Sequence, residues 1–361
     1  MQNNNIYIIY GDKPKSMVIE TLNEMKPERG IPKTAKIGIK PNLVLARPST
    51  SGATTSPEIV EGIIEYFKGK GYEDISIMEG SWIGDRTSRA FKVCGYEDIS
   101  RRYDVPLIDL QKDSPLERNV NGLKLDICSE MDKIDYLINV PVLKGHCQTK
   151  ITCALKNMKG CIPNSEKRRY HTMGLHKPIG YLNKAIRQDL IIVDGIMGDL
   201  NFEEGGNPVR MNRILAGTDP VMMDSYAANL LGFDIEDIPY IAIAEDIGVG
   251  SSNWSEDSII ELNTSESVKI DRGIDKVGLF AKYIEERDAC SACYGSLIHA
   301  MDRLRTRGEL GKIDEKVYIG QYFKGKVKDT GLGVGQCTRG FVKHVPGCPP
   351  SAMDILKFLE D

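Results

Sequence analysis

Short apolar runs separated by helical patterns dominate the first 145 residues. Such alternation is typical of βα units, in which the strands form a mostly parallel sheet and helices cover its faces. The pattern therefore predicts an α/β lobe over residues 1–145. The apolar runs lie at 6–10 (IYIIY), 36–40 (KIGIK), 74–79 (DISIME), 106–110 (PLIDL) and 135–143 (DYLINVPVL).

The same alternation continues over residues 146–270, for which we predict a second α/β lobe. Apolar residues at positions 151, 154, 155 and 158 have helical spacing and predict a helix over 149–159, which Gly160 would end. A buried strand is expected at 189–195 (DLIIVDG) and a helix at 219–232. Two lobes of mostly parallel sheet flanked by helices would then form a cleft.

The segment TTSPEIV at 54–60 predicts the start of a helix. Thr55 and Glu58 have capping-box spacing, and Pro57 suits the first turn of a helix. The loop before it is rich in Ser, Thr and Gly, so its backbone N–H groups could seat an anion at the positive helix end. An ordinary flexible loop before a capped helix is the alternative.

Residues 271–361 form a third expected module, which contains four cysteines with cluster-like spacing. Cys290 and Cys293 form a CxxC pair, while Cys337 and Cys348 lie in Gly-rich and Pro-rich surroundings. Four such thiolates can hold a [4Fe-4S] cluster. Structural zinc and unrelated free thiols are the alternatives. Ten residues separate Cys337 from Cys348, which is unlike the tight second pair of a zinc knuckle and favours iron and sulfur.

The surroundings of these cysteines support an anionic cofactor. A helical stretch is expected from about 275 through the CxxC pair, then a strand at 316–322 and a final helix at 351–359 whose positive end would face the cluster. Near the last two cysteines there is one acid, Asp329, against five basic residues: Lys324, Lys326, Lys328, Arg339 and Lys343.

Amino-acid composition and charge narrow the classes of binding partner and the cellular compartment that we expect. The chain has 361 residues, 27% of them charged, and a net charge of -4, which gives no global signal for nucleic acid or membrane binding. We find no export leader and no apolar run of membrane-spanning length, so we expect a cytoplasmic protein. Nine cysteines without an export signal favour reduced thiols or metal ligands over disulfides.

One stretch of the chain is strongly basic. Residues 144–187 hold ten Lys and Arg and a single acid, Glu166, together with three of the five histidines. Such a field would concentrate a small anion, a carboxylate or a phosphate, although a solvated basic surface is the alternative, especially for residues 167–169. The net charge becomes negative over residues 188–261, which hold fifteen Asp and Glu and two Arg.

Polar side chains also collect after the predicted strands. In open α/β sheets, ligands bind beyond the carboxyl ends of the strands. Lysine amines and amides there could hold an anion, and imidazole titrates near neutral pH. We therefore predict substrate binding by Lys40, Asn42, Lys144, Lys159 and Asp194, and catalysis by His146, His171 and Lys156.

Several motifs in order resemble the "domain of unknown function 362" family of bacterial and archaeal proteins. The resemblance spans roughly residues 36–255 and implies an iron-sulfur protein, although many members carry a ferredoxin-like segment that this chain lacks. The matching motifs are KPNLV (40–44), TTSPEIV (54–60), VPVLKGH (140–146), ALKNMKG (154–160), the Tyr170-His171 pair, IIVDG (191–195) and TDPVMMD (218–224).

Two more distant resemblances accompany this one. The ending with Cys337 and PGCPP is similar to the proximal-cluster region of nickel-iron hydrogenase small subunits, which implies iron and sulfur. The family is also distantly similar to lactate racemase, a two-lobed α/β enzyme with a nickel-pincer cofactor on a lysine. The histidine motif of the racemase does not align with this sequence, so that resemblance assigns no role to a residue here.

Three functions remain open at this level. The leading hypothesis is an iron-sulfur oxidoreductase that acts on a small anionic organic substrate in a basic cleft, with an electron-donor protein as a partner and a homo-oligomer as a further expectation. A non-redox isomerase or lyase with a Lewis-acid or structural cluster is the second. The third is an electron carrier whose basic stretch is a docking face. No GxGxxG motif follows a strand, so bound NAD is not predicted.

Overall fold

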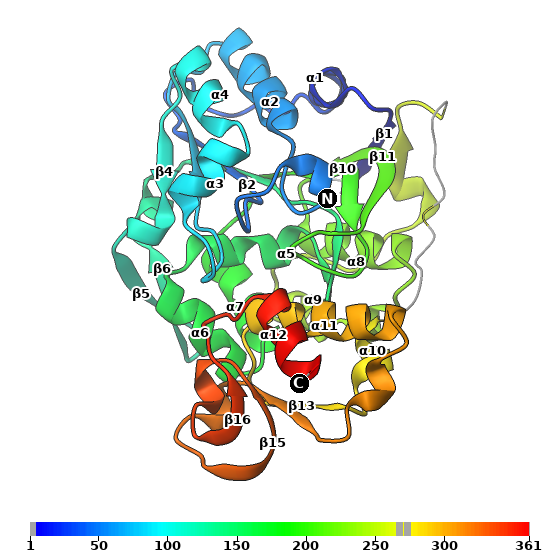
Figure 1. Ribbon diagram of the computed structural model, residues 1–361. Helices are drawn as coiled ribbons and strands as arrows, with labels where there is room; N and C mark the ends of the chain where they lie inside the picture. Colours follow the sequence, from blue (N-terminus) through cyan, green and yellow to red (C-terminus); the bar gives the residue numbers. More distant parts are fainter. Residues whose placement is uncertain (1–4, 265–269, 271–275, 361) are drawn as a thin grey trace. The chain divides into compact units, whose positions relative to one another are not determined.

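The computed structural model describes residues 5–264, 270 and 276–360. The chain divides into two compact units. Figure 1 shows the ribbon coloured by position along the sequence. The first unit contains residues 1–167 and 176–272, and the second contains residues 168–175 and 273–361. This division differs from the predicted lobes at 1–145 and 146–270, because strands from both belong to one sheet of the first unit.

An eight-stranded sheet forms the centre of the first unit, in the order β12-β1-β11-β10-β7-β2-β3-β4. Five neighbouring pairs are parallel, and β11 alone runs antiparallel to both of its neighbours. The prediction of a mostly parallel α/β sheet is confirmed. Its strands are β1 (Ile6–Tyr10), β2 (Ile37–Pro41), β3 (Ile75–Glu79), β4 (Leu107–Asp109), β7 (Tyr136–Val140), β10 (Leu190–Asp199), β11 (Pro208–Gly217) and β12 (Ile259–Glu261).

Helices cover this sheet through apolar faces. In α2 (Pro57–Gly69), residues 59, 60, 63, 64 and 67 are buried, which is the i, i+1, i+4 spacing of one helix face. Each buried aliphatic side chain contributes about 1.5–3 kcal/mol relative to an exposed one. The other helices of this unit are α1 (Pro14–Met25), α3 (Thr87–Val93), α4 (Tyr96–Tyr103), α5 (Ala154–Asn157), α7 (His176–Ala185), α8 (Pro220–Leu230) and α9 (Pro239–Asp246).

The helix α2 starts where the sequence predicts, but without the capping box. Ser56 precedes the helix and makes no side-chain cap, and the Thr55 hydroxyl instead donates to the Val140 carbonyl at 2.7 Å. The same hydroxyl accepts the Asn42 N–H at 2.8 Å. Thr55 thus ties together the ends of β2 and β7, a long-range role that outweighs the local cap.

The predicted helix over 149–159 is wrong in its first half. Residues 144–146 and 150–152 pair as a small hairpin of β8 (Lys144–His146) and β9 (Lys150–Thr152), with Lys150 in a left-handed conformation at φ 64°. The helix α5 begins only at Ala154, because the Asp224 carboxylate accepts the Ala154 N–H at 2.7 Å and caps the start from 70 residues away. A second small hairpin pairs β5 (Pro115–Val120) with β6 (Leu123–Cys128).

The second unit is built on a four-stranded, fully parallel sheet in the order β13-β14-β15-β16. The expected strand at 316–322 and final helix at 351–359 are present as β14 and α12, whereas residues 284–286 form a strand within the stretch predicted to be helical. Its elements are β13 (Ile284–Glu286), β14 (Val317–Ile319), β15 (Lys328–Val334), β16 (Phe341–Val345), α10 (Lys276–Phe280), α11 (Ser291–Thr306) and α12 (Ala352–Glu360). The helix α6 (Asn164–Thr172) supplies residues 168–172 to this unit.

Candidate functional site

Two neighbouring parallel strands bring a buried ion pair to their carboxyl ends. Lys40 on β2 and Glu79 on β3 lie 3.0 Å apart between Nζ and Oε1, with side chains 0% and 3% exposed. A β-carbon on Gly160 would lie 2.1 Å from Glu79 Oε1 and 2.5 Å from Lys40 Nζ, so only glycine fits there. The predicted residue Lys40 therefore lies in a closed, neutralised pair.

A second group of side chains surrounds a single carboxylate and is here called the Glu203 cluster: Lys144, His146, Lys156 and Glu203. Lys156 Nζ lies 2.6 Å from Glu203 Oε2, and His146 Nε2 lies 3.2 Å from the same oxygen. Lys144 Nζ donates to the Glu203 carbonyl at 2.8 Å and to Asn42 Oδ1 at 2.9 Å. All four side chains are buried.

Burial and charge set the protonation states in this cluster. Burial lowers the pKa of Lys144 to about 7, a change that the nearby Glu203 carboxylate partly offsets. Burial also lowers the pKa of His146 to about 4. Burial alone would raise the pKa of Glu203, but His146, Lys156 and Lys144 outweigh it and hold that pKa well below its usual range. At neutral pH the cluster therefore contains an ionised carboxylate beside a lysine whose pKa is lowered into the neutral range.

The tautomer of His146 follows from its hydrogen bonds. Its Nδ1 accepts the backbone N–H groups of Gln148 at 3.0 Å and Thr149 at 3.1 Å. The proton of the neutral ring must then be on Nε2, which faces Glu203. In this state the protonated Nε2 lies 3.2 Å from Glu203 Oε2 but makes no well-aligned hydrogen bond.

Asp194 fills the anion seat that the sequence predicts before α2. Its carboxylate accepts the Ser56 N–H at 2.7 Å, at the start of the helix, and the Ile196 N–H at 3.0 Å. Burial raises the pKa of Asp194 to about 6. The predicted binding loop is thus occupied by a side chain of the protein itself.

The remaining predicted residues lie in different places. Lys159 follows α5 and is close enough to lower the pKa of His146. Asn42 accepts from Lys144 and donates to Asn157 at 2.8 Å. His171 lies on α6, within the stretch 168–175 that belongs to the second unit.

The four predicted metal-binding cysteines come from three segments of the second unit. Cys290 directly precedes α11 and Cys293 lies in its first turn. Burial raises the pKa of the Cys293 thiol, and the thiols of Cys290, Cys348 and Cys337 raise it further. Each of these three side chains is therefore near enough to Cys293 for its charge to act there.

A backbone cradle lies between the cysteine-bearing segments. Gly335, at φ 87°, donates its N–H to the Val345 carbonyl at 2.9 Å, and the Gln336 N–H reaches the Gly347 carbonyl at 2.8 Å. A β-carbon on Gly335 would lie 3.7 Å from Cys293 Sγ. Lys324 and Arg168 both lower the pKa of Cys337, against the larger effect of burial. The residues present fit an anionic, thiolate-ligated group.

The same thiols are also the candidate ligands of a single metal ion. Among residues 5–264, 270 and 276–360, no three His, Cys, Asp or Glu side chains form a group that could hold a metal ion. Tetrahedral zinc with Zn–S distances of about 2.3 Å requires sulfur atoms about 3.8 Å apart. A four-iron cluster is larger and spaces its ligands more widely. The iron-sulfur cluster and the zinc alternative both stay predictions.

Sequence reasoning missed the central carboxylate of the site. Glu203 lies in the connection between β10 and β11, outside every motif singled out above. The signal that could have found it is the change from a basic to an acidic sequence after residue 188. This change brings acids close to the basic stretch only if β10 lies beside β7. That strand pairing is observed as Leu190 opposite Ile138.

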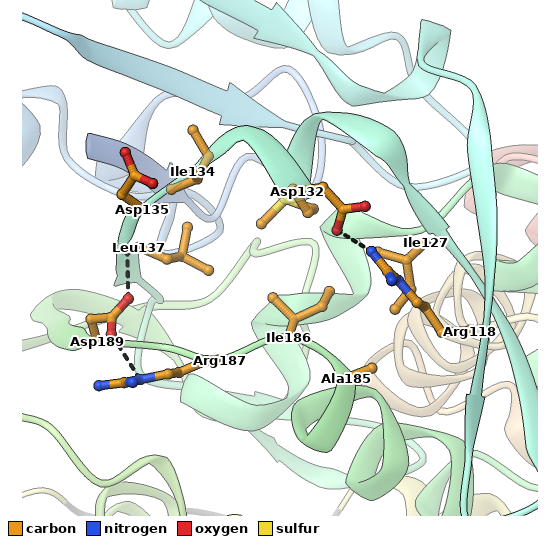
Figure 2. Close-up of a pocket in the computed structure, with 11 residues that line it drawn as sticks. Arg118, Ile127, Asp132, Ile134, Asp135, Leu137, Ala185, Ile186, Arg187 and Asp189 are labelled. Atoms are coloured by element: carbon orange, nitrogen blue, oxygen red, sulfur yellow. Dashed lines mark hydrogen bonds and ion pairs between the residues drawn. The ribbon is translucent and has the colours of Figure 1, made fainter. Parts of the chain in front are cut away.

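A pocket lies at the amino end of the parallel strand β7, away from the Glu203 cluster. It has a volume of about 210 Å³ and lies beside the start of β7 and the end of α7. Figure 2 shows its charges paired with one another: Arg187 with Asp189 at 2.9 Å, and Arg118 with Asp132. Asp189 also accepts the Leu137 N–H at 2.9 Å. Both arginines that line this pocket are therefore paired with a carboxylate.

Comparisons with known proteins agree with the motifs. A family model described as "Domain of unknown function (DUF362)" matches residues 37–229. A thylakoid-associated protein of Synechocystis sp. is 27% identical over 225 residues, which cover 59% of this chain and 68% of that protein. In the part of the chain that the structure describes, no helix is both long and apolar enough to span a bilayer.

Among solved structures, the lactate racemase apoprotein from Thermoanaerobacterium thermosaccharolyticum is similar with a TM-score of 0.41 and 11% identity. The match covers 62% of this chain and 56% of the racemase chain, so this chain spans little more than half of that protein. The family resemblance is confirmed, since the family model covers more than half of the residues. The chain belongs to the family described as domain of unknown function 362.

Proposed function

We propose that this protein is an iron-sulfur enzyme that carries out proton transfer on a small anionic organic substrate at the Glu203 cluster. The observation that carries the proposal is the buried group in which Lys156 and His146 face the Glu203 carboxylate and Lys144, with a pKa of about 7, donates to the Glu203 backbone carbonyl. A buried group of neutral pKa can both accept and release a proton at physiological pH, which is the property of an acid–base catalyst.

Each side chain has a distinct part in this proposal. Lys144 accepts or releases the proton. Lys156, an ammonium beside Glu203, holds the carboxylate or phosphate of the substrate with Lys159. His146 keeps its proton on Nε2 and fixes the orientation of Glu203, so its role is positioning, not the acid–base role that the sequence suggested.

The [4Fe-4S] cluster is the second part of the proposal. Cys290, Cys293, Cys337 and Cys348 would hold it, and when bound it supplies transfer of single electrons. An oxidoreductase that reduces or rearranges the substrate combines this property with the proton chemistry of Lys144. We propose it as the leading class.

A non-redox isomerase or lyase is the second candidate. The neutral pKa of Lys144 favours it, because removal and return of a proton next to a carbonyl require such a group and no electrons. In that case the cluster would serve as a Lewis acid or as a structural element. The third class, an electron carrier, requires no ligand at the Glu203 cluster.

Metal analysis of the anaerobically purified protein tests the cluster. We expect about four irons and four sulfides per chain and no stoichiometric zinc, and loss of most iron in Cys293→Ser. Cys94→Ser is the matched control, because Cys94 is a buried thiol of the first unit and outside the ligand set. Zinc without sulfide, or equal iron in both variants, would refute the cluster.

Spectroscopy and ligand binding then separate the three classes. Reversible reduction by dithionite, followed by EPR, is expected for an oxidoreductase and for a carrier. A thermal-shift screen against small carboxylates and phosphates, repeated on Lys156→Met, should give a ligand-dependent shift only in the unaltered protein if the site is enzymatic. A redox-active protein that no anion stabilises would be a carrier.

A further inference from the structure

Five buried amides form a continuous chain through the first unit, here called the amide chain: Asn42, Asn157, Asn139, Gln188 and Asn183. Each amide nitrogen donates to the oxygen of the next. The distances are 2.8 Å from Asn42 to Asn157, 2.7 Å to Asn139, 2.5 Å to Gln188 and 2.5 Å to Asn183. Every member is less than a tenth exposed.

Both ends of the amide chain fix its direction. At one end, Lys144 Nζ donates to Asn42 Oδ1 at 2.9 Å, and an ammonium can only donate. At the other end, Asn183 Nδ2 donates to the carbonyls of Leu155 at 2.8 Å and Ile179 at 2.9 Å, which can only accept. Reversing any one amide would place two oxygens or two amino groups face to face and cost about 1–3 kcal/mol.

The amide chain connects opposite ends of the parallel strands. Asn42 directly follows β2, at the end that carries the ion pair of Lys40 and Glu79, while Asn139 lies within β7. Gln188 lies in the connection from α7 to β10, whose neighbouring residues Arg187 and Asp189 are labelled in Figure 2. The carbonyls of Leu155 and Ile179, together with the Ala154 carbonyl that also accepts from Asn139 Nδ2 at 2.9 Å, therefore fix the order of the amide chain from the side away from Lys144.

We propose that Asn139, Gln188 and Asn183 are positioning residues that, through Asn157 and Asn42, present an amide oxygen to the Lys144 ammonium and favour its protonated form. All five dipoles point their oxygens toward the lysine, and hydrogen bonds in such series strengthen one another. Lys40 Nζ also donates to Asn157 Oδ1, at 3.4 Å. The inference rests on the proposed function only in taking Lys144 as the acid–base group.

Other charges act on Lys144 as well. Glu203, Glu204 and Asp199 favour its charged form, whereas Lys156 and burial oppose it. These groups set the overall range of the Lys144 titration. The amide chain adds a contribution that an uncharged, distant substitution can remove without touching any of them.

The test is an NMR titration of the Lys144 side chain in the full-length protein. Lysine is labelled with ¹³C, and the Lys144 Cε resonance is identified by its absence in Lys144→Met. In Gln188→Met, an uncharged variant of similar volume, we expect the midpoint of the titration to fall, with a roughly threefold larger acid dissociation constant. A residue that only supports the fold would change stability but not this midpoint.

Gln111→Met is the matched control. Gln111 is also an amide of the first unit, but its Nε2 donates to the carbonyls of Ser81, Trp82 and Asp85, outside the amide chain. Its substitution should leave the Lys144 midpoint unchanged. If Gln188→Met does not fold, Gln188→Asn retains polarity but loses reach and should give the same fall.

An unchanged midpoint in a folded Gln188 variant and in Asn139→Leu would overturn the inference. The titration needs neither substrate nor cluster, so its failure is distinguishable from failure of the proposed function. A protein without iron or without activity would still show a midpoint that depends on Gln188.

Discussion

The ion pair between Lys156 and Glu203 should be strongly coupled, and a double-mutant cycle can measure this. The two charged atoms are 2.6 Å apart, and the side chains are only 5% and 9% exposed. Coulomb's law at an effective dielectric constant of about 20 gives about 6 kcal/mol of attraction at this distance. Removing one partner of such a buried pair typically costs about 3–5 kcal/mol, since the other charge is left without compensation.

The cycle consists of Lys156→Met, Glu203→Gln and the double variant at pH 7. We expect each single variant to lose about 3–5 kcal/mol of unfolding free energy and the double variant to lose much less than the sum. Urea unfolding followed by tryptophan fluorescence reports on the first unit, because Trp82 and Trp254 both lie there.

A surface pair provides the matched control. Lys124 and Glu117 are 2.9 Å apart, but their side chains are 65% and 56% exposed, so their coupling should be below about 1 kcal/mol. A coupling for Lys156 and Glu203 as small as that of the surface pair would refute the reasoning. It would mean that water reaches the Glu203 cluster and that its charges are screened.

Three further substitutions have defined outcomes. Burial raises the pKa of Asp224 to about 7 from 3.8, so the folded state keeps a proton that the unfolded state has lost, and the free energy of unfolding falls as pH rises from about 4 to 7. The Asp224→Asn variant cannot lose this proton, so across this pH window it should gain up to about 4 kcal/mol of unfolding free energy relative to the unaltered protein. Urea titrations at several pH values measure this gain. Gly160→Ala should cost about 1–3 kcal/mol by displacing the ion pair of Lys40 and Glu79, whereas Gly69→Ala, with nothing within 4 Å, should be close to neutral in the same thermal melts. Thr55→Val should lower the unfolding free energy by about 1–3 kcal/mol, because the buried Asn42 N–H and Val140 carbonyl lose their shared hydroxyl; equal melting temperatures would contradict that role.

The strands of the parallel part of the sheet could be predicted from local sequence. The runs at 36–40, 74–79 and 135–143 each became a buried strand, since β-branched residues bounded by turns leave few alternatives. In the structure, the parallel pairing of β2 with β3 places Lys40 next to Glu79. Local sequence was not enough to place β11, which inserts between β1 and β10, because pairing across 200 residues leaves no local signal.

The sequence singled out three of the four residues that the structure brings together in the Glu203 cluster, but not the carboxylate that they share the site with. Lys144 and His146 were expected from their positions after a strand and Lys156 from the predicted helix in the basic stretch, whereas Glu203 reaches them only through the turn from β10 to β11. The short helix α5 was lengthened in the prediction because its apolar spacing continues into β9. What stops it is the Asp224 carboxylate, a contact between distant residues that helical periodicity cannot reveal.

The route of the chain between the two units limits how the protein could be shortened or recombined. Residues 168–175 are grouped with the second unit, where Gln321 Nε2 donates to the Arg168 carbonyl at 2.9 Å, so the polypeptide passes between units three times. A gene fragment starting near residue 273 would lack one piece of its own unit. Transplanting the cysteine-bearing part onto another scaffold would therefore require three cut points instead of one.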